Sequence, residues 1–563
     1  MIPSSLSSVL KVKTRTATLL LSLLVIFALM LSACGGGTTS TQKSTVLTVS
    51  NGPIGSYPQN FNPLLVSNAN PGPRGMIYET LLYFDWQHGT INPWLALSYQ
   101  WSSDATSVTF HLHPNVQWSD GQPFTSADVV FTLNMLKQFP ALDSNGLWNY
   151  LKDVTAPDSS TVVVSFKKPY TPILWYLAGQ TWIVSKHLWS GVSNPVQYTD
   201  SKPVGTGPFM LKSYSAQLID LVKNPKYWQP GKPQVTELRY PAYDSNTTVE
   251  LQLDQGKLDW TGLYTPNIQQ TYVRRDPAHN HYWFPSQAVV MLYVNLSKSP
   301  FNQLPVRQAI SLAIDRNQLN KIGESGYEPP AHPSGLVLPA QQKYLSPDYA
   351  NTSFTVDTAK ANQLLQSAGF TKGSDGIYAD KNGKKLSFSM NVVTGWTDWV
   401  TDCQIMASSL KAIGMNVSVN AISYNAYYSA LQLGNFDTAI SWTTAGPSPF
   451  FLLNALLNSS QTAPLGQTAP TNWERWSDPT TDHLLNQYAT STNASMQTQA
   501  LYGLQKIMVE QVPSIPLVYA ANWNEYSTAH FTGWPSASNP YAYPAPYTYP
   551  DSEVTVLSLK PAS

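Results

Sequence analysis

The stretch FHLHPNVQWSDGQPFTSADV, residues 110–129, decides the fold class because its pattern changes from that of a strand to that of a helix. Val108, Phe110 and Leu112 alternate with polar residues, which predicts a strand with one buried face. The Ser-Asp-Gly sequence at residues 119–121 is typical of a tight turn. The first part of the stretch therefore predicts a strand that leads into a turn.

A helix is expected to follow this turn. Thr125 with Asp128 three residues later is typical of a helix N-terminus, where such side chains satisfy the first backbone N–H groups. Val129, Leu133 and Leu136 then recur at the spacing of one helix face, so this face is predicted to be buried. The whole stretch predicts one strand–turn–helix unit.

The same alternation continues in the second half of the chain. Helices are predicted at residues 305–314, 357–368 and 399–413, where apolar residues recur at helical spacing after a start signal. Strands are predicted at residues 386–392 and 415–419, where apolar and polar residues alternate. Because helices and strands alternate along the chain, the predicted fold class is α/β.

The first 33 residues have the pattern of a cleaved export signal. Three basic residues within positions 11–15 precede an apolar run at residues 17–30. This run is shorter than the roughly 20 residues that a membrane-spanning helix needs. We therefore expect the segment to be removed rather than retained in the membrane.

The sequence Leu-Ser-Ala-Cys at residues 31–34 resembles the lipobox of bacterial lipoproteins. This resemblance implies a diacylglyceryl thioether on Cys34, with residues 34–44 forming the lipidated cysteine and a flexible tether. An ordinary signal peptide with an unmodified cysteine is the alternative. The other cysteine, Cys403, lies on the apolar face of the predicted helix 399–413, so we expect a buried, unreactive thiol without a disulfide partner.

The charge balance limits the classes of partner. The chain has 33 basic and 33 acidic residues, which argues against nucleic acid binding and against a basic membrane-binding patch. Charged residues make up only 12% of the chain, whereas it contains 18 Trp, 31 Tyr and 18 Phe. This composition fits ligand binding by ring stacking and neutral hydrogen bonds, and it also fits a large aromatic core.

The usual catalytic motifs are absent from the sequence. There is no Walker A loop and no His-Glu-x-x-His motif, so ATP hydrolysis would belong to a partner. The pairs His111 with His113 and His279 with His281 have metal-chelating spacing on a strand, but no further ligand lies at an obvious spacing. We predict a binding protein without cofactor or metal. Nickel binding and glycoside hydrolysis by two carboxylates remain less favoured alternatives.

Several motifs in this order resemble the family 5 extracellular solute-binding proteins, which include oligopeptide-, dipeptide- and nickel-binding receptors. The resemblance covers nearly the whole chain after residue 44. It implies a monomeric receptor outside the cytoplasm that closes on its ligand by a hinge and delivers it to an ABC permease with separate ATPase subunits. The motifs are residues 110–129 and the segments Pro203–Phe209, Asn224–Trp228, Val306–Arg316, Ala359–Gly369 and Pro513–Leu517.

The resemblance also implies a two-lobed periplasmic-binding-protein-like fold of type II, with three structural domains and mixed sheets. A chain of 563 residues exceeds what one core usually organises, so several lobes are expected on size alone. The expected division is residues 45–78, 203–300 and 522–563 for lobe I, 79–202 for a small second domain packed on it, and 301–521 for lobe II.

One departure from the family concerns the ligand. Peptide-binding members carry a Trp followed closely by an Asp that receives the peptide ammonium group, whereas here Trp442 is followed by Thr443 and Thr444. An unpaired buried ammonium group costs several kcal/mol, roughly 3 to 5. Either another acid serves this role, or the ligand has no free amine.

Oligopeptides or dipeptides are the leading ligand hypothesis, and oligosaccharides of the cello- or xylo- type are the alternative. Aromatic side chains would stack on sugar rings, and neutral groups would bind the hydroxyls. The candidate ring platforms are Trp442, Trp396 and Tyr57, and the candidate hydrogen-bonding groups are Asn391, Ser441, Thr443 and Thr444.

Overall fold

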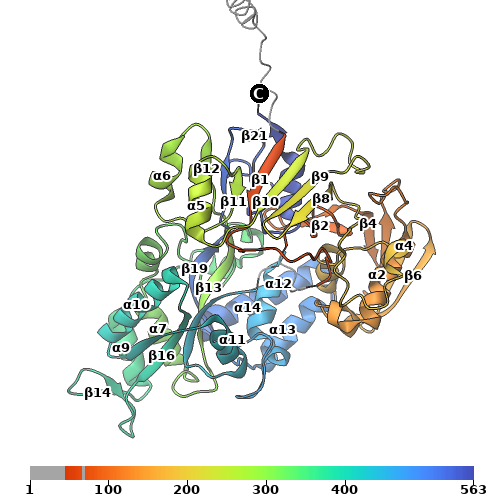
Figure 1. The fold of residues 1–563 in the computed structure, drawn as a ribbon. Coiled ribbons are helices and arrows are strands. Elements are labelled where there is room, and N and C mark those ends of the chain that lie inside the picture. The colour runs from red at the N-terminus through yellow and green to blue at the C-terminus, as the bar shows by residue number, and fades with distance from the viewer. Residues whose placement is uncertain (1–44, 66–69, 445, 563) are drawn as a thin grey trace, which may run out of the picture. The chain divides into compact units, whose positions relative to one another are not determined.

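The computed structural model describes residues 45–65, 70–444 and 446–562. The predicted export signal, the tether and Cys34 lie outside these residues. Helices and mixed β-sheets alternate along the described chain, which confirms the predicted α/β class (Figure 1). No helix within the described ranges is both long and apolar enough to cross a membrane.

The stretch at residues 110–129 forms the predicted strand, turn and helix. Val108 and Phe110 are buried on β5 (Ser107–Leu112), and α2 (Ser126–Gln138) follows the turn. The backbone N–H of Thr125 donates to Oδ2 of Asp128 at 2.9 Å, so the predicted pair does cap the helix. The strand belongs to an antiparallel sheet in the order β4 (Ala96–Trp101), β5, β7 (Thr161–Phe166) and β6 (Leu151–Asp158).

A seven-stranded mixed sheet combines distant parts of the chain. Its central strand β1 (Val46–Ser50) runs parallel to both neighbours, and the other pairs are antiparallel. Early, middle and late residues therefore depend on one another for this sheet. The strand order is β12 (Asn280–Tyr282), β20 (Glu525–Ser527), β11 (Trp260–Thr261), β1, β10 (Glu237–Pro241), β9 (Leu218–Lys223) and β8 (Phe209–Ser215).

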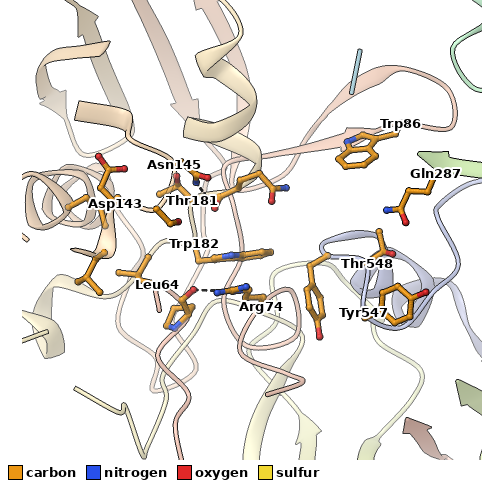
Figure 2. Close-up of a pocket in the computed structure, with 16 residues that line it drawn as sticks. Leu64, Arg74, Trp86, Asp143, Asn145, Thr181, Trp182, Gln287, Tyr547 and Thr548 are labelled. Carbon is orange, nitrogen blue, oxygen red and sulfur yellow. Dashed lines mark hydrogen bonds between the residues drawn. The ribbon is translucent and has the colours of Figure 1, made fainter. Parts of the chain in front are cut away.

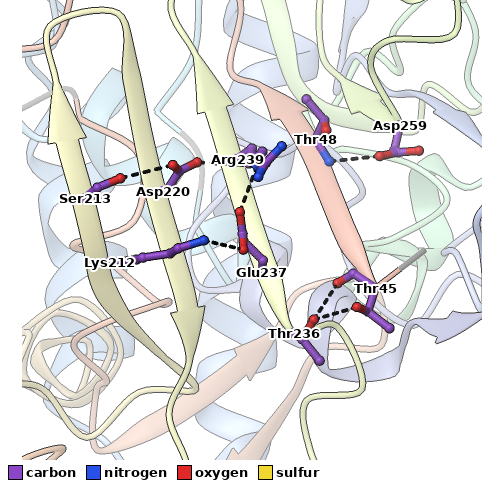
Figure 3. Close-up of polar contacts among 9 residues, drawn as sticks. All are labelled: Thr45, Thr48, Lys212, Ser213, Asp220, Thr236, Glu237, Arg239 and Asp259. Carbon is purple, nitrogen blue, oxygen red and sulfur yellow. Dashed lines mark hydrogen bonds and ion pairs between the residues drawn. The ribbon is translucent and has the colours of Figure 1, made fainter. Parts of the chain in front are cut away.

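Side-chain contacts fix β1 within this sheet (Figure 3). The N–H of Thr48 donates to Oδ2 of Asp259 at 2.8 Å. Oδ1 of Asp259 lies 2.7 Å from Nδ1 of the His530 ring. Glu237 accepts from Lys212 at 2.7 Å across the strands. Asp259 contributes most because it is buried, whereas exposed ion pairs contribute little to stability.

A five-stranded mixed sheet forms the second large sheet. β16 pairs in parallel with β17 and β18, and β13 is antiparallel to β18 and β19. The helices α7 (Leu304–Ala313), α9 (Thr358–Ser367) and α10 (Thr397–Ala412) lie beside this sheet (Figure 1). The order is β17 (Asn416–Ile422), β16 (Ser387–Val393), β18 (Thr438–Trp442), β13 (Ser286–Val294) and β19 (Ile515–Ala521).

Cys403 lies in the core between α10 and this sheet. Its side chain is fully buried, as predicted, and burial raises the pKa of the thiol well above its usual value. The thiol is therefore protonated and unreactive at neutral pH.

The remaining elements are short or cover the sheets. The longer helices are α11 (Tyr424–Leu433), α12 (Pro449–Leu457), α13 (Pro479–Ala489), α14 (Ala494–Gln511), α5 (Asn246–Asp254) and α15 (Asp551–Ser558). Short helices are α3 (Leu147–Tyr150), α4 (Lys186–Trp189), α6 (Ile268–Thr271) and α8 (Arg316–Gln318). Single helical turns are η2 (Pro140–Leu142), η3 (Trp175–Gly179), η4 (Val273–Arg275), η5 (Leu319–Gly323), η6 (Gln342–Tyr344), η7 (Pro347–Tyr349) and η8 (Ser459–Gln461). Two-stranded ribbons pair β2 (Leu82–Asp85) with β3 (Thr90–Pro93), β14 (Thr371–Lys372) with β15 (Tyr378–Ala379), and β21 (Phe531–Thr532) with β22 (Lys560–Pro561).

The division of the chain into lobes stays a prediction. One strand suggests a refinement, because β13 lies within residues 203–300, which the prediction assigns to lobe I. Its partners β18 and β19 both lie within residues 301–521, the predicted lobe II. The boundary that we now propose therefore lies before Ser286.

Candidate functional site

A cavity of about 520 Å³ lies at one end of the five-stranded sheet. The end of β18, the start of α10 and the end of β19 all contribute to its wall. Four of the seven predicted ligand-binding residues meet there, although they come from two separate segments. The lining residues are Gln287, Ala288, Glu328, Trp396, Asp398, Trp399, Trp442, Thr443, Thr444, Ala520, Ala521, Trp523 and Tyr547.

Three tryptophan rings form one wall of this cavity, which we call the Trp442 cavity. The ring centroid of Trp442 lies 5.2 Å from that of Trp396 and 5.3 Å from that of Trp399. Trp399 is buried, whereas Trp442 is 41% exposed even though it ends a sheet strand. Because Trp442 lines the cavity and is partly exposed, its ring offers an open face to a ligand.

The two threonines after Trp442 play different parts. The N–H of Thr443 donates to the carbonyl of Val289 at 2.9 Å, and Oγ1 of Thr443 accepts from the N–H of Val289 at 3.2 Å. These two bonds extend the pairing of β18 with β13 by one residue. Thr444 is exposed and carries the more accessible hydroxyl.

Two acidic residues line the same cavity, and the sequence analysis did not single out either of them. Asp398 lies in the first turn of α10, two residues after Trp396. Glu328 lies in the loop after η5, is 4% exposed, and accepts the N–H of Ala521 on Oε1 at 2.8 Å. Its other oxygen, Oε2, has no hydrogen-bond partner among the residues that the structure describes. Burial raises the pKa of both carboxyl groups.

A signal in the sequence was available for only one of these acids. Asp398 is close to the predicted platform Trp396 at a helix start, where acids are common. Glu328 reaches the cavity because the loop after η5 packs on β19, and no local pattern predicts that contact. The cavity beside Trp442 therefore contains two carboxyl groups that come from other segments of the chain.

A second cavity of about 480 Å³ adjoins the Trp442 cavity, because Gln287 and Tyr547 line both. Figure 2 shows Gln287, Thr548 and Tyr547 on one side, Asp143 and Asn145 on the other, and Arg74 between them. We call it the Arg74 cavity. Most of its polar lining is uncharged, and its other polar residues are Ser144, Gln180, Thr181 and Tyr549.

The two charged residues of the Arg74 cavity differ in what they can offer a ligand. Asp143 accepts the N–H groups of Leu147 and Trp148 at 2.8 and 3.0 Å, so its charge is used to cap α3. Arg74 donates only to the carbonyls of Pro63 and Leu65, at 3.2 and 2.8 Å. Its positive charge therefore has no carboxylate partner in the described residues.

The other three predicted ligand-binding residues are not among those that line either cavity. Ser441 is fully buried on the strand face opposite Trp442. Asn391 is buried on β16, where its Oδ1 accepts from Asn420 at 2.9 Å. Tyr57 is buried beside the seven-stranded sheet and donates its hydroxyl to the carbonyl of Pro241 at 3.2 Å. We leave these three residues out of the site proposed below.

The histidine pairs have other neighbours. His279 lies 2.8 Å from Asp276, and Nε2 of His281 lies 3.3 Å from the Thr528 hydroxyl. The His113 ring packs on Trp228 at 4.7 Å between centroids. Within the described part of the chain, no three His, Cys, Asp or Glu side chains come together as metal ligands.

Comparison with known proteins finds relatives that are named as binding proteins. The nickel-binding periplasmic protein of Escherichia coli K12 is 25% identical over 420 residues, which cover 70% of this chain and 75% of that protein. A putative ABC transporter peptide-binding protein of Brucella ovis is 28% identical over 433 residues, covering 73% and 76%. Both relatives are named as binding proteins.

Solved structures give the same fold. The periplasmic oligopeptide-binding protein of an oligopeptide ABC transporter from Thermotoga maritima has a TM-score of 0.85 at 25% identity, covering 92% of this chain and 100% of its own. A mannohexaose-bound structure of an oligopeptide-binding protein from the same organism has a TM-score of 0.76 at 25% identity, covering 92% and 99%. The predicted periplasmic-binding-protein fold is thus confirmed.

The family model described as bacterial extracellular solute-binding proteins, family 5 Middle, matches residues 90–464, which is more than half of the chain. This match agrees with the relatives, with the fold and with a ligand-sized site between distant segments. The chain therefore belongs to the family 5 bacterial extracellular solute-binding proteins, which capture solutes outside the cytoplasm for ABC importers.

Proposed function

We propose that this protein captures oligopeptides and delivers them to the permease of an ABC importer. The observation that carries this proposal is that acidic residues line one cavity and an arginine lines the adjoining one. Asp398 and Glu328 line the Trp442 cavity, and Arg74 lines the neighbouring one. A free peptide carries an ammonium group at one end and a carboxylate at the other, so it would meet a complementary group at each.

The ammonium end of the peptide would lie in the Trp442 cavity. Asp398 would pair with the charge, and the exposed face of Trp442 would add a cation–π contact. The carboxylate end would meet the Arg74 guanidinium, whose planar donors suit a carboxylate. In this arrangement Asp398 takes the part that an acid after Trp442 plays in peptide-binding members of the family.

An oligosaccharide is the second candidate ligand. The open ring of Trp442 and the mostly neutral polar lining of the Arg74 cavity both suit sugar rings and hydroxyls. The similarity to the mannohexaose-bound Thermotoga maritima structure also supports it. The charge of Arg74 favours the peptide, because a neutral sugar would leave this guanidinium without a counter-charge and would not pair with the carboxyl groups of Asp398 and Glu328.

We further propose that the protein acts as a monomer whose lobes close on the ligand by a hinge, and that a lipid on Cys34 tethers it to the cell membrane. Mass spectrometry of protein purified from membranes tests the anchor. A diacylglyceryl mass on Cys34 is expected, and release of the Cys34→Ser variant into the soluble fraction is the expected control result.

A thermal-shift screen of the full chain tests the ligand class. Short peptides, manno-, cello- and xylo-oligosaccharides and Ni²⁺ are added separately. A ligand at 100 times its Kd stabilises the folded protein by about 2.7 kcal/mol, which raises Tm by a few degrees. We expect this shift with peptides. A shift with sugars and none with peptides would replace the peptide proposal by the oligosaccharide one.

A further inference from the structure

Two more carboxyl groups lie directly behind the Trp442 cavity. Glu324 follows η5, and Asp402 lies one helical turn along α10 from Asp398. Both are fully buried, and neither is among the residues that line the cavity. We call Glu324, Glu328, Asp398 and Asp402 the acid cluster. Glu328 and Asp398 form its open side, and the other two form its closed side.

The closed side of the acid cluster is tightly packed. A Cβ atom on Gly323 would lie 1.9 Å from Oδ1 of Asp402, so only glycine allows η5 to approach α10 this closely. The side chains of Glu324 and Asp402 are hydrogen-bonding neighbours. Two carboxylates have only acceptor oxygens, and in the described part of the chain none of these four oxygens has another donor. A proton must therefore lie between the two groups.

The acid cluster has no balancing positive charge. In the described residues, no Lys, Arg or His forms an ion pair with any of its four members. The titratable groups that face it are neutral, namely the hydroxyls of Tyr264 and Tyr547 and the thiol of Cys403. Among the described residues, no positively charged side chain therefore neutralises the acid cluster.

The pKa values agree with this arrangement. Burial and then the charge of its neighbours raise the pKa of Glu324 to about 8 and that of Asp402 to about 10. Burial raises the pKa of Glu328 well above its usual value, with Glu324 adding to the effect. In the empty protein at neutral pH, the buried acids thus hold protons instead of charge.

The acid cluster reaches the ligand through Glu328. Its Oε2 has no partner within the described ranges, Glu328 is 4% exposed, and it shares the cavity with Trp442. We propose that Glu328 gives up a proton to the solvent when the ammonium group of a ligand binds beside it. This step rests on the proposed peptide function. The ligand stays protonated, the O–H bond of Glu328 breaks, and the new carboxylate pairs with the ammonium group.

Calorimetry of the full chain tests this coupling. Peptides of three to five alanines are titrated at pH 7 in phosphate and in Tris, whose ionisation enthalpies differ. We expect the two binding enthalpies to differ by the amount that corresponds to about one released proton. Between pH 7 and 5 the affinity should fall by up to about tenfold per pH unit, because protons compete with the ligand for Glu328.

Two variants and one modified peptide separate the outcomes. Glu328→Gln should bind alanine peptides with no proton release, whereas the exposed Glu510→Gln should behave like the unmodified protein. N-acetylated peptides lack the ammonium group and should release no proton. Equal enthalpies in both buffers, or unchanged release in Glu328→Gln, would overturn the coupling alone. Absence of binding by every alanine peptide would overturn the peptide function together with it.

Discussion

The acid cluster and a second buried carboxyl pair show how the same chemistry serves two purposes. Glu79 and Glu553 are hydrogen-bonding neighbours and are fully buried, and burial raises the pKa of Glu79 to about 7. Glu79 accepts from the Tyr227 hydroxyl at 3.1 Å and from the Trp228 ring N–H at 3.0 and 3.1 Å. Neither acid lines the cavities described above.

The difference lies in the donors. Neutral protein donors satisfy Glu79 in the core, whereas Oε2 of Glu328 faces a cavity without a partner. A buried acid with its own donors stabilises the fold, and a buried acid without them is available to a ligand. The sealed pair, Glu79 with Glu553, should therefore affect folding, and the acid cluster should affect binding.

Glu79→Ala is expected to give the largest effect. It removes the acceptor of Tyr227 and Trp228, leaves Glu553 without its neighbour and opens a cavity. The unfolding free energy should fall by about 4 kcal/mol, while ligand affinity stays the same. Denaturant titration measures the first quantity and calorimetry the second. A loss below about 1 kcal/mol would show that the sealed pair is not structural.

In contrast to Glu79→Ala, Asp398→Asn should weaken ligand binding and leave stability nearly unchanged. It removes the charge that we pair with the peptide ammonium group, and hydrogen bonds to charged groups contribute about 1.5 to 3 kcal/mol. Peptide affinity should therefore fall by tenfold or more, with little change in Tm. The exposed Asp153→Asn is the matched control and should bind normally. Unchanged affinity in Asp398→Asn would remove this residue from the site.

The sequence predicted the local elements of the molecule better than its site. Periodicity and capping residues predicted β5, the turn and α2, because these signals are local. Trp396, Trp442, Thr443 and Thr444 meet in one cavity, as strand ends of one sheet can do. Asn391 and Ser441 instead point into the core, because strand register decides which face a residue takes. Glu328 and Arg74 reach their cavities through loop packing, which leaves no periodic signal.

The buried acids should make the stability of this protein depend on pH, because their pKa values differ between the folded and unfolded states. The folded-state pKa of Glu79 is about 7, above its unfolded value, so the folded protein binds the proton more tightly. The stabilisation that protonated Glu79 contributes is complete below pH 4.5 and is lost as pH rises to 7. Asp551, with a pKa of about 7, acts in the same window.

The unfolding free energy should therefore rise when pH is lowered from 7 to 5, by about 1.4 kcal/mol for each pH unit and each proton bound on folding. Tm should rise with it. Differential scanning calorimetry across this range measures it, and Glu79→Gln should reduce the slope. A Tm that falls on acidification would contradict the proposed protonation of the buried acids.

Trp442→Ala gives the smallest expected effect and tests the tryptophan wall of the cavity. Aromatic contacts contribute about 0.5 to 1.5 kcal/mol, so peptide affinity should fall by about threefold to tenfold. Tm should change little because the ring is 41% exposed, and the similarly exposed Leu251→Ala should alter neither quantity. Trp442→Phe should keep much of the affinity, since a ring face remains. If an oligosaccharide were the ligand, the ring would be a main contact and Trp442→Ala would abolish binding, so this variant also separates the two ligand classes.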